Sequence, residues 1–265
     1  MNNKTVQTTL PVDRVQGSVL KEPKFVGRKQ IIDELNQFLD QAINGQGAVV
    51  FISGEAGSGK TRLMNEFIEE AKKRRTQIIS GWCLSNSAIP YFPFTEAFES
   101  YLSSRLALDQ DEDQGLKSSL IELNQVHRKE LAPQTWKDRT FSAIAKELLA
   151  ISTKQPLIFC IDDLHWADSA SLALLHYIAR ALEAERILII STFRYEEINT
   201  QGPNASPLSQ TLRLMGREGL YSEIKLENLS RHETQAIAEN LLDGKAQKSF
   251  IEKLQTDSRG NPLFI

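Results

Sequence analysis

The chain has 265 residues, of which 41% are hydrophobic, 25% are charged and 8% are aromatic. These values are ordinary for a globular protein, and the length allows one large domain or one domain with part of another. The formal net charge of −3, from 31 basic and 34 acidic residues, gives no field that would gather nucleic acid or an anionic membrane.

The first residues carry no targeting signal. Residues 1–22 are polar and lack periodicity, which predicts a loose tail, and no hydrophobic region follows Lys4. Every apolar run is far shorter than the roughly 20 residues of a membrane helix. The two cysteines, Cys83 and Cys160, form no Cys-x-x-Cys pair, so the sequence indicates neither a disulfide framework nor a zinc site. We therefore expect a soluble, cytoplasmic protein.

Strand-like and helix-like patterns then alternate along the chain. Apolar residues recur at helical spacing from Arg28 to Ile43, and Asn44-Gly45 ends that helix. Five apolar runs that follow predict strands, and helical patterns separate them. Such alternation predicts an α/β fold with a parallel sheet covered on both faces. The predicted strands are residues 48–52, 77–83, 156–161, 186–192 and 220–226.

A long insertion, residues 84–155, separates the second and third strands. It is predicted to contain three helices, at about 94–106, 115–130 and 138–151.

The end of the chain is predicted to be helical. Ser230 and Glu233 form a capping box that opens a helix at about 231–243, and a second helix covers 246–257. The apolar ending of residues 263–265 is unusual for a finished domain, and it predicts that the chain is a fragment.

The most informative segment lies between the first strand and the helix after it. It reads Gly-x-x-x-x-Gly-Lys-Thr, with a strand to aim the loop and a helix whose amides meet an anion. The glycines allow successive N–H groups to point inward, Lys60 would reach the β- and γ-phosphates, and Thr61 would bind Mg²⁺. We therefore expect ATP with Mg²⁺ to bind here. The expected nucleotide-binding residues of this segment are Gly54, Glu55, Ala56, Gly57, Ser58, Gly59, Lys60, Thr61 and Arg62.

Two further strand ends complete the predicted site. The third strand ends in Asp162 and Asp163, at the edge of a parallel sheet where ligands bind. Asp162 would hold Mg²⁺, and Asp163 would orient and polarise the attacking water. The fourth strand is followed by Arg194, whose guanidinium could read the γ-phosphate. The predicted catalytic residues are Lys60, Asp163 and Arg194.

These motifs resemble the signal-transduction ATPases with numerous domains (the STAND class). The likeness is to the AAA+-like ATPase module of large LuxR-type regulators and of proteins beside class III adenylyl cyclases. It covers residue 25 to the last residue, and its most specific parts are Asp-Asp-Leu-His-Trp-Ala-Asp and Gly-Asn-Pro-Leu. The matching segments are Phe25-Val26-Gly27-Arg28, the phosphate loop, Gly81-Trp82-Cys83, Tyr91-Phe92-Pro93-Phe94, Asp162 to Asp168, Thr192-Phe193-Arg194 and Gly260 to Phe264.

The resemblance implies properties that spacing does not reveal. It implies a phosphate-loop NTPase sheet of order 5-1-4-3-2, in which Arg194 senses the γ-phosphate. It implies that Phe25, Val26 and Gly27 help to hold the adenine, and that Pro262 contacts the nucleotide from a lid. The domains expected are a tail at 1–22, an ATPase core at 23–228, and the truncated start of a helical lid at 229–265. The resemblance also leads us to expect a winged-helix region, repeats and an effector in the family's usual extent, which the segment up to Ile265 does not include.

Neighbouring residues of the motif are interpreted structurally. His165 and Trp166 are expected to hold the turn after the strand, although a histidine there could also serve as a base or sensor. Asp168 is expected to cap the next helix.

The predicted function is an ATP·Mg²⁺-binding, slowly hydrolysing signal-transduction ATPase that acts as a nucleotide switch, in transcriptional or signalling regulation. Its partners would be ATP or ADP and other proteins or copies of itself, with DNA bound only through absent domains and no membrane contact. One alternative is a DNA-associated AAA+ ATPase of the origin-recognition or transposition-helper type, which the net charge disfavours. Another is a non-hydrolysing, nucleotide-dependent scaffold.

Overall fold

The computed structural model describes residues 24–85, 89–106, 117–118, 121, 134–198 and 205–265. The predicted tail and most of the predicted helix at 115–130 therefore lie outside the described residues. Within the described part, no helix combines the length and apolar character needed to cross a membrane.

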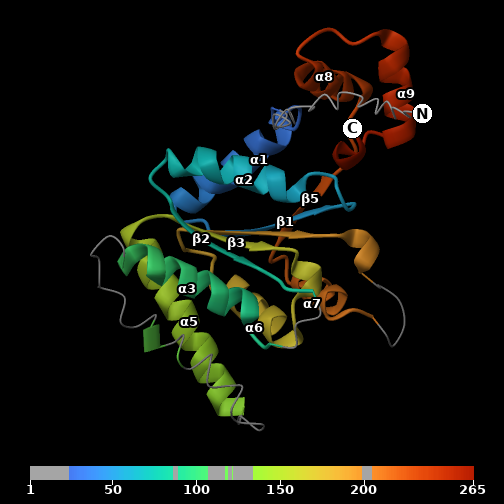
Figure 1. The fold of residues 1–265 in the computed structure, drawn as a ribbon. Helices are drawn as coiled ribbons and strands as arrows, with labels where there is room; N and C mark the ends of the chain where they lie inside the picture. Colours follow the sequence, from blue (N-terminus) through green and yellow to red (C-terminus); the bar gives the residue numbers. More distant parts are fainter. Residues whose placement is uncertain (1–23, 86–88, 107–116, 119–120, 122–133, 199–204) are drawn as a thin grey trace, which may run out of the picture.

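A parallel sheet of five strands forms the centre of the molecule (Figure 1). Its spatial order is β2-β3-β4-β1-β5, which confirms the predicted order read from the opposite edge. All four neighbouring pairs are parallel. The strands are β1 (Ala48–Gly54), β2 (Gln77–Trp82), β3 (Leu157–Asp162), β4 (Ile187–Phe193) and β5 (Ser222–Leu226).

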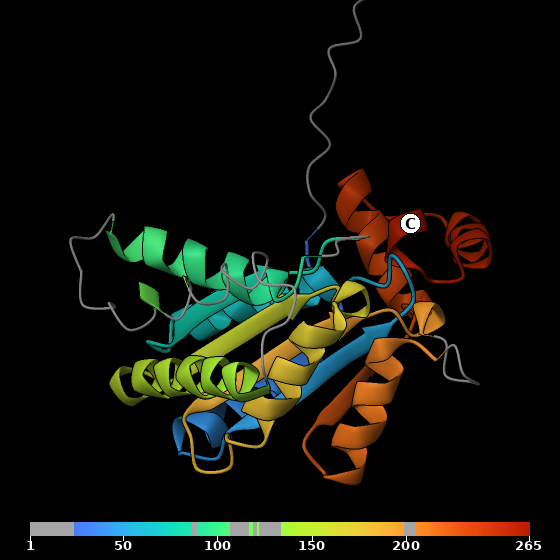
Figure 2. The ribbon, with the colours of Figure 1, turned by 90° about the horizontal axis from the view of Figure 1, so that it is seen from below.

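Helices cover both faces of the sheet, as predicted (Figures 1 and 2). Alternate residues of β1 explain the two layers, since side chains of a strand point to opposite faces. Val50 and Ile52 join the apolar cluster of α1 (Lys29–Ile43) and α2 (Lys60–Lys72). Phe51 joins the cluster of the opposite face. The helices of that face are α3 (Phe92–Leu106), α5 (Gln134–Lys154), α6 (Ser169–Ala179) and α7 (Pro207–Arg217).

The insertion contains helices in its described part. The helices predicted at 94–106 and 138–151 are present as α3 and α5, each of which begins earlier than predicted. Buried aromatic rings anchor α3 to the sheet: the ring centroids of Phe94 and Phe159 lie 5.4 Å apart, and both side chains are fully buried.

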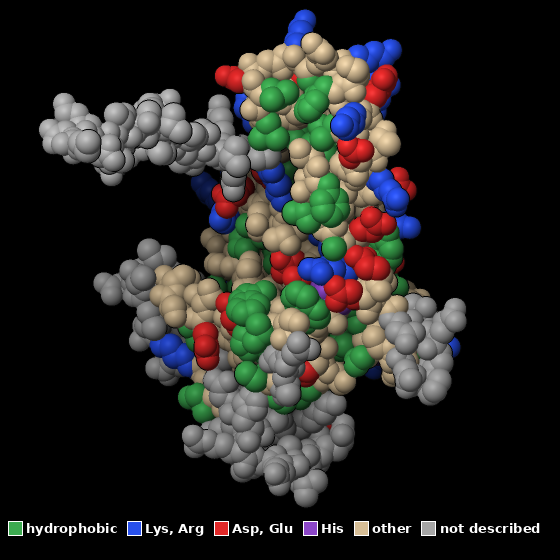
Figure 3. Space-filling view, turned by 45° about the vertical axis from the view of Figure 1, so that its right-hand side comes forward, with side chains coloured by type: hydrophobic (Ala, Val, Ile, Leu, Met, Phe, Trp, Pro, Cys, Tyr) green, Lys and Arg blue, Asp and Glu red, His purple; other side chains and the backbone are tan. Residues whose placement is uncertain are grey.

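The last elements lie beyond the carboxyl ends of the strands. They are α8 (Arg231–Leu242), α9 (Lys248–Ser258) and a short 3₁₀ turn, η4 (Pro262–Phe264). The predicted capping box is present, because Ser230 and Glu233 exchange their hydrogen bonds. Hydrophobic side chains reach the surface of this region (Figure 3), among them Leu263 and Phe264 at 69% and 68% exposure. The predicted lid role and self-association remain predictions.

Candidate functional site

The phosphate loop joins β1 to α2 through left-handed backbone. Gly57 and Gly59 have φ angles of +76° and +92°, which side-chain-bearing residues rarely adopt. A Cβ atom at Gly57 would lie 2.6 Å from the Cβ of Leu263, so the loop and the 3₁₀ turn η4 approach closely only because this residue is glycine. The loop therefore has the backbone geometry that an anion nest requires.

Lys60 lies at the start of α2, with 6% of its surface exposed. Its Nζ donates hydrogen bonds to the carbonyl oxygens of Gly54 (2.9 Å) and Glu55 (2.7 Å). Burial lowers the pKa of the ammonium, while the charge of Glu196 acts in the opposite direction. The ammonium is thus held over the phosphate loop by two neutral acceptors.

A hydrogen-bonded group of side chains links the loop to β3 and β4. The Thr61 hydroxyl donates to Oδ2 of Asp162 at 2.8 Å, and the Thr192 hydroxyl donates to Oδ1 of the same carboxylate. Thr192 Oγ1 in turn accepts the backbone N–H of Asp163 at 3.0 Å. The structure therefore brings together the two residues that the sequence predicted for magnesium, and it adds Thr192, which the motif reading had not assigned.

Thr61 and Asp162 fit the chemistry of Mg²⁺. Both offer hard oxygen atoms, and Mg²⁺ is commonly bound by one or two carboxylates together with substrate phosphates and water. The described residues contain no group of three or more His, Cys, Asp or Glu that could hold a metal alone. Mg²⁺ held by Thr61 and Asp162 would need further oxygen ligands, which phosphates and water can supply.

Asp163 begins a short 3₁₀ turn, η2 (Leu164–Trp166), with a φ angle of +55°. Burial, and then the adjacent charge of Asp162, raises the pKa of its carboxyl group. His165 follows it, with a side chain only 1% exposed and neither ring nitrogen hydrogen-bonded within the described residues. Its Nδ1 lies 3.8 Å from Asp163 and its Nε2 lies 3.6 Å from Glu197.

The environment of His165 is compatible with either of the roles considered for it, so its structural interpretation stays a prediction. Burial lowers the pKa of its imidazole, which favours the neutral ring that can accept a proton. The sequence analysis gave priority to a structural interpretation, and the signal that favoured a chemical one was its place two residues after Asp163.

Arg194 lies at the carboxyl end of β4 and makes a specific ion pair. Its Nη1 donates to Oε1 of Glu197 at 2.7 Å, and its guanidinium lies over the Trp166 ring, 5.2 Å from the centroid. Trp166 Nε1 also donates to Oε2 of Glu197 at 3.3 Å. The structure brings Arg194 to the same edge of the sheet as Asp163, and its predicted role toward a γ-phosphate stays a prediction.

The turn after Arg194 contacts the phosphate loop directly. This turn, η3 (Tyr195–Glu197), places Oε1 of Glu196 at 2.6 Å from the N–H of Ala56, and the Tyr195 hydroxyl donates to Glu55 at 2.9 Å. A carboxylate therefore accepts a hydrogen bond from a loop amide that the sequence analysis assigned to phosphate binding. No sequence pattern pointed to these contacts.

Phe25 and Val26, two of the three residues predicted to hold the adenine, lie beside the loop. A small cavity of about 40 Å³ is lined by Phe25, Val26, Arg62 and Pro262, together with neighbouring residues of the loop and α8. Gly27 packs elsewhere: its φ is +73°, and a Cβ atom there would lie 2.1 Å from Glu233.

The turn at Asn261 connects the last helices to the loop. Asn261 Nδ2 donates to the carbonyl oxygen of Ala56 at 2.9 Å, and the backbone N–H of Leu229 donates to Gly260 at 2.7 Å. Asp168 caps α6 as predicted, because its carboxylate accepts the N–H groups of Ala170 and Ser171.

Residues 24–190 match the family described as AAA ATPase domain. The chain belongs to this family. It is therefore a nucleotide-binding ATPase module, and the family match confirms the predicted resemblance to AAA+-like phosphate-loop ATPases.

The chain is also similar to individual proteins. It is 25% identical, over 226 residues, to an uncharacterized protein of Rhizobium meliloti (strain 1021), covering 76% of this chain and 21% of that protein. The chain thus spans about a fifth of that relative's length.

The chain is similar to solved structures that include a STAND protein. This is PH0952 of Pyrococcus horikoshii, which has a tetratricopeptide repeat sensor; identity is 22%, covering 91% of this chain and 29% of that one, with a TM-score of 0.47. Another is the structure of Drosophila ORC bound to DNA, with 13% sequence identity and a TM-score of 0.56. That match covers 100% of this chain and 62% of the ORC chain. At such identity the likeness concerns the fold alone.

Proposed function

We propose that this AAA ATPase module is a nucleotide switch of the STAND class, which binds ATP with Mg²⁺ and hydrolyses it slowly. The observation that carries the proposal is the hydrogen-bonded junction of Thr61, Asp162 and Thr192 beside the buried Lys60. A structural loop would not need a buried ammonium and a carboxylate held by two hydroxyl groups at one sheet edge. A nucleotide site needs both.

The roles of the residues follow from their positions. The loop amides and Lys60 bind the β- and γ-phosphates, where Lys60 exchanges its two carbonyl acceptors for phosphate oxygens. Thr61 and Asp162 hold Mg²⁺, which would neutralise developing charge on the phosphates. Phe25, Val26 and Pro262 line the cavity proposed for the adenine.

Asp163 and His165 orient the attacking water. The raised pKa of Asp163 brings its carboxylate closer to the range in which it can take up a proton, and the neutral ring of His165 lies 3.8 Å away. Arg194 is released from Glu197 when a γ-phosphate offers a stronger partner, and this exchange would report the nucleotide state.

Turnover by such a switch should be slow, below the ~1 s⁻¹ at the low end of typical turnover numbers. We propose residues 23–228 as the ATPase core, 229–265 as the start of a lid and 1–22 as a tail. The setting we propose is cytoplasmic signalling or transcriptional regulation, with protein partners or further copies of the chain as its readout.

Replacing Lys60 tests the proposal. Removing one partner of a desolvated charge pair costs about 2–5 kcal/mol, so Lys60→Ala should weaken Mg·ATP binding about 30-fold or more. The matched control is Lys72→Ala in the same helix, since Lys72 is exposed and, among the described residues, forms an ion pair with Glu69 alone. Calorimetric titration of both variants decides the matter: equal affinities in the wild type and Lys60→Ala would refute the assignment of the loop.

A second pair of variants tests hydrolysis. Asp163→Asn should bind Mg·ATP as the wild type does and lose most phosphate release, because the metal ligand survives while water polarisation is lost. Asp162→Asn should instead weaken the dependence of binding on Mg²⁺. Wild-type hydrolysis by both variants would contradict these roles.

A further inference from the structure

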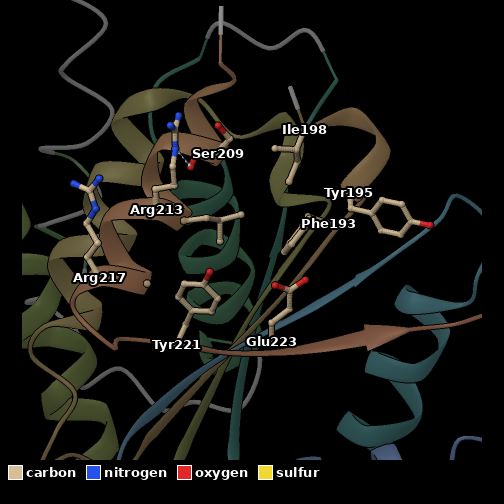
Figure 4. A pocket seen from close by; sticks show the side chains of 10 residues that line it. Phe193, Tyr195, Ile198, Ser209, Arg213, Arg217, Tyr221 and Glu223 are labelled. Carbon is tan, nitrogen blue, oxygen red and sulfur yellow. Dashed lines mark hydrogen bonds between the residues drawn. The ribbon is translucent and has the colours of Figure 1, made fainter. Parts of the chain in front are cut away.

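A second, larger cavity opens on the face of the sheet covered by α7, between that helix and the edge strand β5 (Figure 4). Its volume is about 560 Å³, against about 40 Å³ for the cavity beside the phosphate loop. Pockets of roughly 300–1,000 Å³ are typical of small-molecule sites. None of the residues that line it belongs to the predicted nucleotide site.

Aromatic rings form the floor of this cavity. Phe193 and Tyr221 line it, and Phe51 packs behind them, with centroids 6.2 Å from Phe193 and 4.9 Å from Tyr221. Gly216 of α7 also lines the cavity, and a Cβ atom there would make only ordinary contact with the Tyr221 ring, at 3.6 Å. The floor is therefore aromatic and supported from behind.

The charged groups of the cavity are unevenly placed. Arg213 and Arg217 extend from α7 on one side of the view, and Glu223 lies across from them on β5 (Figure 4). Within the described residues neither arginine has a carboxylate partner, whereas Glu223 accepts a hydrogen bond from Ser53. Ser209 adds a buried hydroxyl without a hydrogen-bond partner in the described part of the chain. Both arginines are exposed, and Arg213 Nε donates to the carbonyl oxygen of Ser209 at 3.4 Å (Figure 4). Two guanidinium groups without a carboxylate partner in the described residues, beside an aromatic floor, suit an aromatic molecule that carries an anion.

One side chain that lines the cavity also contacts the phosphate loop. Tyr195 lines the cavity, and its hydroxyl donates to Glu55 of the loop at 2.9 Å. The next residue, Glu196, places its carboxylate on the Ala56 amide. A molecule packed against Tyr195 would hold η3 in this position, with a negative charge where a phosphate is expected.

We propose that this cavity binds a small aromatic carboxylate, held by Arg213 and Arg217, and that Tyr195 couples its occupancy to the phosphate loop. The binding half is independent of the proposed nucleotide switch, and the coupling half rests on it. Since coupling between two sites is reciprocal, the ligand should weaken ATP binding and ATP should weaken ligand binding by the same factor.

The binding half is tested on the whole chain with naphthalene-2-carboxylate as the probe and its neutral carboxamide as the matched compound. By calorimetry without nucleotide, we expect the carboxylate to bind the wild type with one-to-one stoichiometry and at least tenfold more tightly than the carboxamide. Arg213→Gln with Arg217→Gln should remove this preference, and Arg139→Gln, at an exposed position of α5, should keep it. Absence of binding, equal affinity for the two compounds, or a preference that survives the double change would overturn the site. If the probe does not bind and Leu212→Arg converts a dimer into a monomer, the cavity is an interface between copies and the proposal is wrong.

The coupling half is tested by ATP titrations with and without saturating probe. We expect the probe to weaken ATP binding at least threefold in the wild type. Tyr195→Phe keeps the wall of the cavity but removes the bond to Glu55, so it should bind the probe normally and show no effect on ATP. Unchanged ATP affinity in the probe-bound wild type would overturn the coupling. Failure of ATP to bind at all would instead reject the nucleotide switch. The probe titrations without nucleotide would still test whether the cavity binds the carboxylate.

Discussion

Two adjacent buried hydroxyl groups near the end of β4 offer a sharp test of how the site is held together. Ser191 and Thr192 are both fully buried. Thr192 donates to the Asp162 carboxylate and accepts the N–H of Asp163, whereas the Ser191 hydroxyl has no partner in the described residues. Thr192→Val and Ser191→Ala therefore each remove one hydroxyl, and only the first removes hydrogen bonds.

The expected magnitudes follow from these contacts. Valine keeps the shape of threonine, so Thr192→Val chiefly loses a hydrogen bond to a charged group, which is worth about 1.5–3 kcal/mol. The Asp163 N–H retains a second acceptor, since Oδ1 of Asp162 lies 3.1 Å away, and this limits the additional penalty. We therefore expect Thr192→Val to lower the free energy of unfolding by about 2 kcal/mol. Ser191→Ala should change it by less than about 0.5 kcal/mol, because no bond is lost.

The same change should affect the site. Without the Thr192 hydroxyl, the Asp162 carboxylate is held less firmly and should bind Mg²⁺ less well. A cost of about 1.4 kcal/mol would weaken Mg·ATP binding tenfold. ATP binding without Mg²⁺ should be unchanged.

Urea unfolding followed by tryptophan fluorescence measures the first effect, as a shift in midpoint at constant slope. Titration of ATP with and without Mg²⁺ measures the second. Equal midpoints for Thr192→Val and the wild type, or equal losses for the two variants, would refute the idea that this junction stabilises the site.

Three further outcomes are expected. Burial and the charge of Asp162 raise the pKa of Asp163, so the charged carboxylate lowers the stability of the fold above that pKa. This cost vanishes at a pH below the ordinary pKa range of carboxyl groups. Asp163→Asn should therefore raise the melting temperature at about pH 7 and leave it unchanged at about pH 3. Arg194→Ala should leave ADP affinity nearly unchanged and reduce the preference for a non-hydrolysable ATP analogue, and equal losses for both nucleotides would make the arginine structural. Gly216→Ala introduces only ordinary contacts within a helix and should stabilise the fold by about 0.5–1 kcal/mol. Gly81→Ala would bring a Cβ atom to 2.1 Å from the Pro93 carbonyl oxygen and should destabilise the fold by about 1–3 kcal/mol. The melting temperatures of the two variants should therefore shift in opposite directions.

The sequence predicted the parts of the fold that depend on local pattern. All five strands lie within two residues of their predicted starts and ends, because buried parallel strands read as short apolar runs bounded by polar residues. The phosphate loop could likewise be predicted from the sequence, since its glycines, its lysine and the helix that follows it are contiguous in the chain. Asp168 and Ser230 were identified as caps for the same reason: each accepts hydrogen bonds from residues only two or three positions away.

The contacts that sequence analysis missed join distant segments through side chains. Glu196 and Tyr195 each contact a residue 140 positions earlier, and no periodicity marks a three-residue turn as a partner of the phosphate loop. The environment of His165 depends on Glu197, which lies on a different strand connection. Such contacts are set by turn geometry and side-chain orientation, which composition and spacing do not encode.

Sheet order explains why these distant residues nevertheless meet. β4 lies between β1 and β3, although it follows both in the chain. Its carboxyl end must therefore lie between the phosphate loop and the Asp162 carboxylate. Thr192 is thus placed to donate to that carboxylate, and the turn after Arg194 is placed to reach Ala56. The residues after β4 therefore contact both the phosphate loop and the cavity under α7. The turn at 195–197, which no motif announced, is consequently where we expect changes in nucleotide state to be transmitted.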